Sequence, residues 1–295
     1  MSRVQPGPLL AEEPAKGARG DSCNPSTPRK GVIMPALGTA KRLWALDSPT
    51  FTVQANTLMY GLSGELTIPT PAYLIEHPRG LILFDTGLVP AAHDDPHAVY
   101  GELADLIKLA AKPEQRLDRQ LTALGYRPSD VTHVIASHSH LDHTGGLYLF
   151  PEATFYAGQG ELGFAYWPTN IGAGLFRTAD LEPTRHWNWR HIPGIDVDLF
   201  GDGSIVILFT PGHTPGELSL LVRLPSRNFI LTGDTVHLRA ALENEIHHPL
   251  DSDTRAAIRS LQRLKLLRDS ADATVWIAHD PEDWAEHRHQ PYAYE

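Results

Sequence analysis

The chain has 295 residues, of which 42% are hydrophobic and 20% are charged. This composition is that of a globular protein and excludes disorder over the whole length. The 25 basic residues against 35 acidic ones give a formal net charge of −10, and this acidic balance argues against a nucleic-acid partner. The sequence contains no run of 18 apolar residues, so no membrane span is predicted.

The N-terminal part differs from the rest of the chain. Residues 1–33 are rich in Pro, Gly, Ser and charge without apolar periodicity. They are either a disordered extension or upstream sequence wrongly included ahead of Met34. No apolar segment of a signal peptide follows Arg3, and the one cysteine, Cys23, excludes an internal disulfide framework. We therefore expect a cytoplasmic protein whose residues 34–295 form a single domain.

The first half of that domain alternates short strands with helices. Pro71–Glu76 and Gly80–Asp85 predict a hairpin. Leucines at helical spacing predict a helix over Pro113–Leu124, and the β-branched run Val131–Ser137 is typical of a buried strand. The segment 158–190 is irregular and rich in aromatic residues, which is consistent with a binding loop or with a small satellite core beneath a loop. Candidate substrate contacts in this segment are Phe164, Tyr166, Trp167 and Phe176.

The second half repeats this order. Ser204–Thr210, Glu217–Val222 and Asn228–Thr232 resemble strands, Asp251–Arg268 carries an apolar helical stripe, and Thr274–Ala278 is a last strand. Strands with a helix are thus followed by strands with a helix. This order predicts an α/β (α+β) fold in which two sheets pack face to face with helices outside.

A histidine cluster follows the strand that ends near Ser137. His138, His140, Asp142 and His143 lie within six residues of one another. In an extended segment residues i and i+2 point to the same side, so His138 and His140 can bind one cation together. The following turn directs Asp142 and His143 toward a second position. Imidazole and carboxylate ligands favour Zn, Fe, Mn or Co over Ca or Mg.

Further candidate ligands follow other predicted strands. His213, Asp234 and His279 each lie just after a β-run, where loops gather on one rim of the fold. Without a metal, such a cluster would bury unpaired polar groups at a cost of about 1–3 kcal/mol each. The sequence therefore predicts two divalent metal ions bridged by Asp234. One ion would bind His138, His140 and His213, and the other would bind Asp142, His143 and His279.

These motifs carry a family resemblance. HSHLDH (residues 138–143), TPGHTPG (210–216), GD (233–234) and AHD (278–280) resemble the metallo-β-lactamase superfamily, whose fold is an αβ/βα sandwich of two mixed sheets. Ile68–Gly87 and Ile277–Trp284 are similar to the N-acyl-homoserine lactonase group within it. The resemblance implies that residues 34–295 are one hydrolase domain with two metals, most commonly zinc, which opens lactones in quorum quenching.

The resemblance also implies roles for single residues. A hydroxide that bridges the metals would attack the lactone carbonyl, and Asp142 would protonate the leaving oxygen. Asp85 would orient a metal-binding histidine. His237 stands where many of these lactonases have a Tyr that hydrogen-bonds the substrate. An imidazole can also donate such a bond, so His237 is a candidate catalytic residue, although the change could mark a different lactone or a plain surface residue.

Alternatives to this activity stay open. The same chemistry could act on another lactone such as a pyridoxolactone-like ring, on a thioester or on an organophosphate. A non-catalytic metal- or signal-binding protein on the same scaffold is a further alternative. In each case the expected partner is a small molecule, with no nucleic acid or membrane, and the chain is a monomer or a homodimer.

Overall fold

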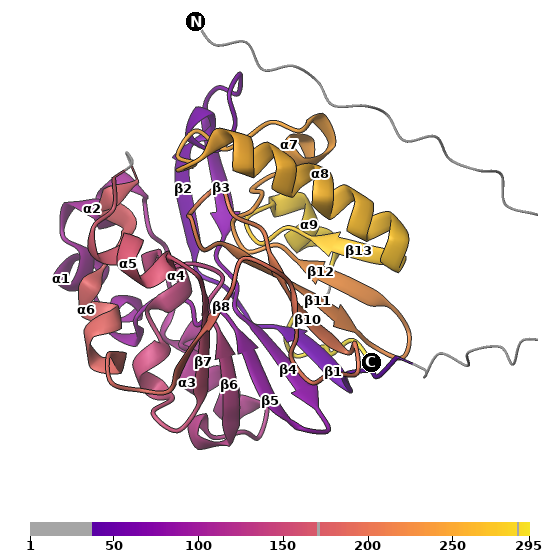
Figure 1. Ribbon diagram of the computed structural model, residues 1–295. Helices are drawn as coiled ribbons and strands as arrows, with labels where there is room; N and C mark the ends of the chain where they lie inside the picture. The colour runs from indigo at the N-terminus through magenta and orange to yellow at the C-terminus, as the bar shows by residue number, and fades with distance from the viewer. Residues whose placement is uncertain (1–36, 170–171, 288) are drawn as a thin grey trace, which may run out of the picture. The chain divides into compact units, whose positions relative to one another are not determined.

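In the part of the chain that the structure describes, two mixed β-sheets lie face to face (Figure 1). The computed structural model describes residues 37–169, 172–287 and 289–295. The predicted extension, residues 1–33, lies outside these ranges, so its disorder and the domain boundary at residue 34 stay predictions.

The first sheet has the strand order β1-β4-β5-β6-β7-β8. Its first three strands pair antiparallel, and the predicted hairpin is the β4–β5 pair. From β5 to β8 the strands are parallel, so their C-terminal ends share one edge. The strands are β1 (Arg42–Ala45), β4 (Tyr73–His77), β5 (Gly80–Phe84), β6 (Val131–Ile135), β7 (Thr154–Gly158) and β8 (Trp189–Ile192).

The second sheet has the order β13-β12-β11-β10-β9. Because β12 pairs parallel with β13 and antiparallel with β11, which is itself antiparallel to β10, the strands β10, β12 and β13 run in the same direction. Their C-terminal ends therefore lie at one edge. The strands are β9 (Val197–Asp198), β10 (Ile205–Phe209), β11 (Leu218–Arg223), β12 (Asn228–Leu231) and β13 (Ala273–Trp276).

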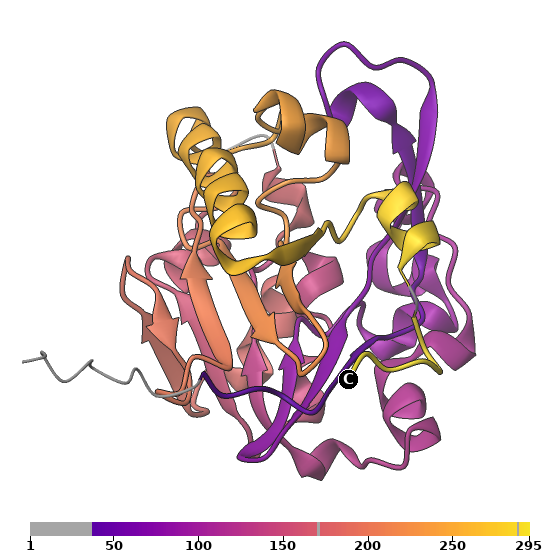
Figure 2. The same ribbon diagram turned by 90° about the vertical axis from the view of Figure 1, so that its right-hand side faces the viewer.

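Apolar side chains form three layers around these sheets. The central layer lies between the sheets and includes Ile82 and Phe84 from the first and Ile207 and Phe229 from the second. A second layer joins the outer face of the first sheet to helices. The third joins the outer face of the second sheet to the long helix α8 (Figure 2). The predicted sandwich with outer helices is confirmed.

The helices are short except for α8. The predicted helix over Pro113–Leu124 is a 3₁₀ turn over Pro113–Gln115 followed by α3. Asp253 caps α8 by accepting hydrogen bonds from two backbone N–H groups of its first turn. The helices are α1 (Pro96–Tyr100), α2 (Glu102–Leu106), α3 (Leu117–Ala123), α4 (Leu141–Thr144), α5 (Glu161–Tyr166), α6 (Thr178–Leu181), α7 (Arg239–Asn244), α8 (Thr254–Ala271) and α9 (Pro281–Glu286).

A hairpin of β2 (Thr50–Gln54) and β3 (Glu65–Pro69) forms a separate two-stranded sheet. Figure 2 shows it rising beyond the edges of the two main sheets. Its apolar residues Phe51 and Ile68 pack with the third apolar layer. Among the described residues, no helix is both long and apolar enough to cross a membrane.

Candidate metal centre

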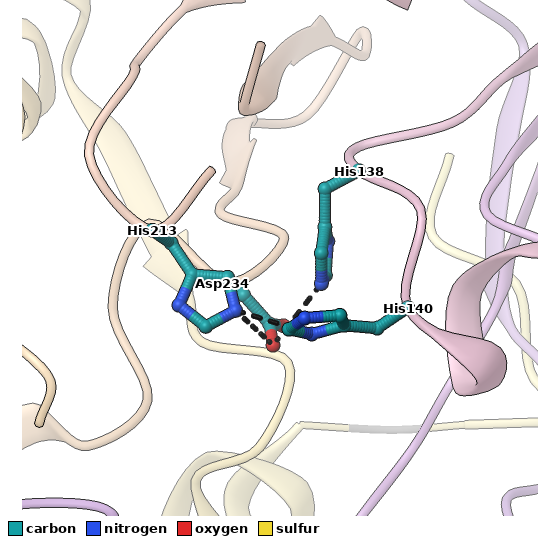
Figure 3. Close-up of side chains that lie close together, drawn as sticks. All are labelled: His138, His140, His213 and Asp234. Carbon is teal, nitrogen blue, oxygen red and sulfur yellow. Dashed lines mark hydrogen bonds and ion pairs between the residues drawn. The ribbon is translucent and has the colours of Figure 1, made fainter. Parts of the chain in front are cut away.

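Asp234 lies at the centre of a cluster of histidines where the sheet edges meet. It follows β12, and its Oδ2 atom is 3.6 Å from Nε2 of His138 and 3.5 Å from Nε2 of His213. His140 faces the same point, with its Nδ1 atom 3.3 Å from Nε2 of His213. Figure 3 shows the three imidazoles converging on the carboxylate. The structure thus brings together the first predicted group of ligands.

The second predicted group faces the other oxygen of the same carboxylate. Oδ1 of Asp234 is 3.2 Å from Nε2 of His143 and 3.0 Å from Nε2 of His279. Asp142 completes this group, with Oδ2 at 3.5 Å from the His143 nitrogen and 3.7 Å from the His279 nitrogen. Each oxygen of Asp234 therefore faces its own set of side chains, which is the arrangement that a bridging carboxylate requires.

The spacing of these atoms fits bound metal ions. Two ligand atoms that each lie about 2.0–2.2 Å from a tetrahedral zinc are separated by roughly 3.3–3.6 Å, and the distances above cluster around these values. The Nε2 atoms of His138 and His143 and Oδ1 of Asp234 are buried and make no hydrogen bond within the described part of the chain. Buried polar atoms without a partner destabilise the fold unless a cation binds them. The residues present therefore fit bound metal ions.

Burial prepares some of these rings for metal binding. It lowers the pKa of His138 and of His140 well below the usual value for histidine, so both are neutral near pH 7. Neutral imidazole is the form that binds metals. Burial also acts to lower the pKa of His143, but the nearby Asp234 and Asp142 carboxylates outweigh it and raise that pKa well above its usual value. A metal at this second position must therefore displace a proton.

In three of the metal-facing histidines, a hydrogen bond to Nδ1 fixes the ring on the side away from the metal position. Nδ1 of His143 is 2.9 Å from Oδ2 of Asp85, which follows β5 with a left-handed backbone (φ 62°). Nδ1 of His213 is 3.2 Å from Oδ1 of Asp251, and Nδ1 of His279 is 2.6 Å from the carbonyl oxygen of Pro69. These partners fix the tautomer that points Nε2 at the metal position.

Two fully buried carboxyl groups support the cluster and were not predicted. Oε1 of Glu217 accepts a hydrogen bond from the backbone N–H of Asp234 at 2.9 Å, and its Oε2 lies 3.4 Å from Nδ1 of His138. Glu161 accepts bonds from the backbone N–H groups of Ser139 and Gly216 and so ties the two histidine loops together. Their only sequence signal is a charged residue at the start of an otherwise apolar segment.

The glycine before Asp234 is required by this packing. Gly233 has a φ of 53°, and a Cβ atom there would lie 2.6 Å from both Oε1 of Glu217 and the Cβ of Ser137. Glycine adopts this conformation at little cost and, because it lacks a Cβ atom, leaves this space free. The GD motif therefore reflects how closely the second sheet's loop approaches the histidine loop of the first.

An open cavity ends at this cluster, and the space within it and at its open mouth is together about 530 Å³. Its wall is mostly apolar and comes from the β2–β3 hairpin and nearby loops. The wall residues include Phe51, Val53, Leu58, Ile68, Ile107, Leu175 and Leu250, and the floor includes His140, Asp142, His213, Asp234, His237, His248 and His279. An apolar cavity with a few convergent polar groups is typical of a small-molecule site.

The aromatic residues predicted as substrate contacts do not line this cavity. Trp167 is 81% exposed and Tyr166 is 38% exposed. Phe164 and Phe176 pack edge to face, and the ring of Phe176 lies against His140 with centroids 4.4 Å apart. Phe176 thus supports a metal-facing ring from the side, and the cavity wall comes largely from the hairpin instead.

His237, the residue at the position where a Tyr was expected, is buried in the floor. Its Nε2 atom is 3.1 Å from Oδ2 of Asp234, and burial lowers its pKa. Its ring is stacked on His248, with centroids 3.8 Å apart and planes 13° apart. His248 was not predicted, because the His247–His248 pair follows no predicted strand and matches no ligand motif.

The fold and this cluster of ligands agree with a known family. Residues 67–279 match the model of the metallo-beta-lactamase superfamily, and the chain belongs to this superfamily. Within it, the chain groups with the N-acyl homoserine lactonases. The N-acyl homoserine lactonase AttM of Rhizobium radiobacter is 34% identical over 258 residues, which cover 86% of this chain and 98% of that relative.

Other members of the group are more distant. The N-acyl homoserine lactonase of Bacillus cereus is 29% identical and covers 74% of this chain and 83% of its own length. Among solved structures, an N-acyl homoserine lactone hydrolase with the product N-hexanoyl-L-homoserine at its catalytic metal centre superposes with a TM-score of 0.77 at 25% identity. The match covers 87% of this chain and all of that one.

Proposed function

We propose that this protein is a dinuclear metal-dependent hydrolase that opens the lactone ring of N-acyl homoserine lactones and so quenches quorum signalling. The observation that carries the proposal is Asp234, whose two oxygens face two separate sets of ligands at the floor of an apolar cavity. The names of the relatives support the choice of substrate.

The metal ions would be held as the sequence predicts. His138, His140 and His213 would bind one ion and Asp142, His143 and His279 the other, with Asp234 shared. Nitrogen and carboxylate donors at these spacings favour zinc, with iron, manganese and cobalt as alternatives. When bound, such a pair lowers the pKa of a water toward neutrality and polarises the lactone carbonyl.

The chain's own residues orient the substrate and manage the protons. Hydrolysis forms a bond from the water oxygen to the lactone carbonyl carbon and breaks the ring C–O bond, and the leaving oxygen then takes up a proton. Asp142 lines the cavity and is the group that we assign to take up the proton released by the attacking water and to deliver it to the leaving oxygen. His237 holds Oδ2 of Asp234 through its Nε2 atom, so in this tautomer it acts on the shared carboxylate.

The test pairs elemental analysis with a pH-stat assay of N-acyl homoserine lactones on one sample. We expect about two metals per chain and release of acid, both lost after chelation and restored by zinc. His213→Ala should lose one metal together with turnover, because it removes a ligand of one ion only. Turnover that persists after both metals are removed would exclude the proposal.

Assays with a panel of substrates distinguish the alternative functions. Two metals per chain without acid release would move the assignment to another lactone, a thioester or an organophosphate. The N-acyl homoserine lactone assignment predicts that kcat/KM depends on acyl-chain length, because the cavity wall is apolar. Binding without turnover would favour the non-catalytic alternative.

We also propose a cytoplasmic monomer or homodimer without nucleic-acid or membrane partners. The acidic net charge supports the lack of a nucleic-acid partner. Fractionation of the producing cells and sedimentation of the purified protein would test these points.

A further inference from the structure

His248 carries a hydrogen-bond donor that the proposed chemistry does not use. Its Nδ1 atom accepts a hydrogen bond from the backbone N–H of Leu250 at 3.2 Å. Nδ1 therefore holds a lone pair, and the ring proton must be on Nε2. This Nε2 atom is buried and has no hydrogen-bond partner in the described part of the chain. The side chain lines the cavity, and the residue is 7% exposed.

The stacking of the rings argues against a metal held jointly by His237 and His248. Nitrogen atoms of His213, His237 and His248 lie within 4.8 Å of one another, which is close enough for a shared ion. However, an imidazole binds a metal in its own plane, where the lone pair points, and the planes of His237 and His248 are only 13° from parallel at a centroid separation of 3.8 Å. Two rings stacked face to face in this way direct their lone pairs along separate, nearly parallel planes and cannot both aim at one ion. The free N–H of His248 is thus available to an acceptor on a ligand.

The position of His248 indicates which acceptor of a bound ligand its N–H would reach. His237 contacts Asp234 directly. His248 stacks on His237 and lies edge to face against His213, and it makes no ion pair with Asp234 in the described part of the chain. The reacting lactone carbonyl must lie at the metals. In an N-acylated lactone the next acceptor along the molecule is the amide carbonyl oxygen, and beyond it the acyl chain would meet the apolar wall at residues such as Leu58 and Leu250.

We propose that His248 is a specificity-determining residue that donates its Nε2–H to the amide carbonyl oxygen of an N-acylated lactone. This inference rests on the proposed function, because it uses the lactone to place the substrate. A buried donor that stays unpaired penalises a ligand lacking the acceptor, so the site discriminates against unsubstituted lactones.

Two substitutions separate this donor from the structural role of the ring. In His248→Asn the side-chain oxygen can replace Nδ1 as the acceptor for the Leu250 N–H, but no donor reaches the Nε2 position. In His248→Gln the amide nitrogen can reach the Nε2 position. His247→Asn is the matched control, because His247 is the adjacent residue and lines no part of this cavity.

The readout is the ratio of kcat/KM for N-hexanoyl homoserine lactone to that for γ-butyrolactone, which has the ring but no amide. We expect this ratio to fall about tenfold in His248→Asn, the factor that corresponds to one neutral hydrogen bond. It should recover at least in part in His248→Gln and stay at the wild-type value in His247→Asn. An equal loss on both lactones, or no loss on either, would overturn the proposal.

A binding measurement tests the role of His248 separately from the proposed lactonase activity. Calorimetry with the zinc-loaded protein and the ring-opened N-hexanoyl-L-homoserine needs no turnover, and L-homoserine without the acyl amide is its control. We expect His248→Asn to weaken binding of the acylated compound about tenfold and to change that of L-homoserine less. A wild-type protein that turns over neither lactone refutes the proposed function, whereas unchanged binding in His248→Asn refutes the role of His248.

Discussion

The floor of the cavity is held by directional hydrogen bonds, whereas its wall is held by apolar packing. On the floor, His213 and His279 each point one ring nitrogen inward and have the other fixed by a named acceptor. His143 is held in the same way within the metal cluster. On the wall, residues such as Leu58 and Ile68 only pack against neighbours in an apolar layer.

This difference separates two kinds of function. The hydrogen bonds of the floor require particular atoms at particular positions, so a substitution there should affect metal binding and the chemical step together. Apolar packing has no direction, and its contribution scales with buried area. A substitution in the wall should therefore change which acyl chains are accepted and leave the metals in place.

The largest effect is expected from Asp85→Asn. Asp85 accepts hydrogen bonds from the backbone N–H of Ser137 and contacts Nδ1 of His143. Asparagine can replace one of these acceptors but presents an N–H₂ group in place of the other. We expect metal affinity to fall about 10–100-fold, as is usual when such a partner of a metal-binding histidine is removed. Competition with a chromophoric chelator measures it.

Asp180→Asn is the matched control for this substitution. Asp180 is as buried as Asp85, at 2% against 1% exposed, but its ion pair is with Arg177 rather than with a histidine. Equal losses of metal affinity in the two variants would mean that burial of a carboxylate, not its contact with a metal-binding ring, decides affinity.

The contrast between floor and wall also explains what the sequence could reveal. His138, His140, Asp142 and His143 follow one strand within six residues, so local spacing alone brings them together. His213, Asp234 and His279 were predictable because each follows a strand, and the parallel directions of β10, β12 and β13 place those strand ends at one edge. The sandwich followed from the order of the elements.

The supporting residues could not be found in this way. Glu161, Glu217 and Asp251 are single acidic residues whose meaning depends on which loop packs against them. The wall was missed for a similar reason. The segment 158–190 stands out by its aromatic composition, yet the hairpin that forms much of the wall has ordinary strand residues such as Phe51 and Val53. Tertiary contacts between distant segments, rather than local pattern, define both.

A smaller effect is expected from Leu58→Ala in the wall. The shorter side chain removes apolar contact from a long acyl chain, at about 0.8 kcal/mol for each methylene that loses its cover. With two such groups affected, kcat/KM for a long-chain lactone should fall roughly tenfold more than that for a short-chain one. Metal content should stay at the wild-type value.

Leu121→Ala provides the comparison for that experiment. Leu121 is fully buried in the apolar layer behind the first sheet and does not line the cavity. Its truncation should lower the free energy of unfolding by about 2–5 kcal/mol without changing the chain-length preference. If both variants shift the preference alike, general loosening of the fold is responsible, and the wall has no special role.

The smallest effect on activity is expected from Asp180→Asn, which should instead change the free energy of unfolding in a pH-dependent way. Burial raises the pKa of Asp180 to about 6, although Arg177 acts in the opposite direction. Because the folded protein binds this proton more tightly than the unfolded chain, Asp180 stabilises the fold below about pH 4, and this contribution is lost as the pH rises through about 6. The Asn variant should therefore gain stability relative to the wild type, by on the order of 2 kcal/mol at pH 7 and by little at pH 4.

Urea unfolding of both proteins at the two pH values measures this difference. We expect Asp180, which supports no metal-binding ring, to behave as an ordinary buried acid. Removing its charge should stabilise the fold and leave metal content unchanged. If the difference between variant and wild type is the same at pH 4 and pH 7, the ion pair with Arg177 offsets the burial of Asp180. The hydrogen bond from Arg177 would then stabilise this buried carboxylate just as hydrogen-bond partners do on the floor.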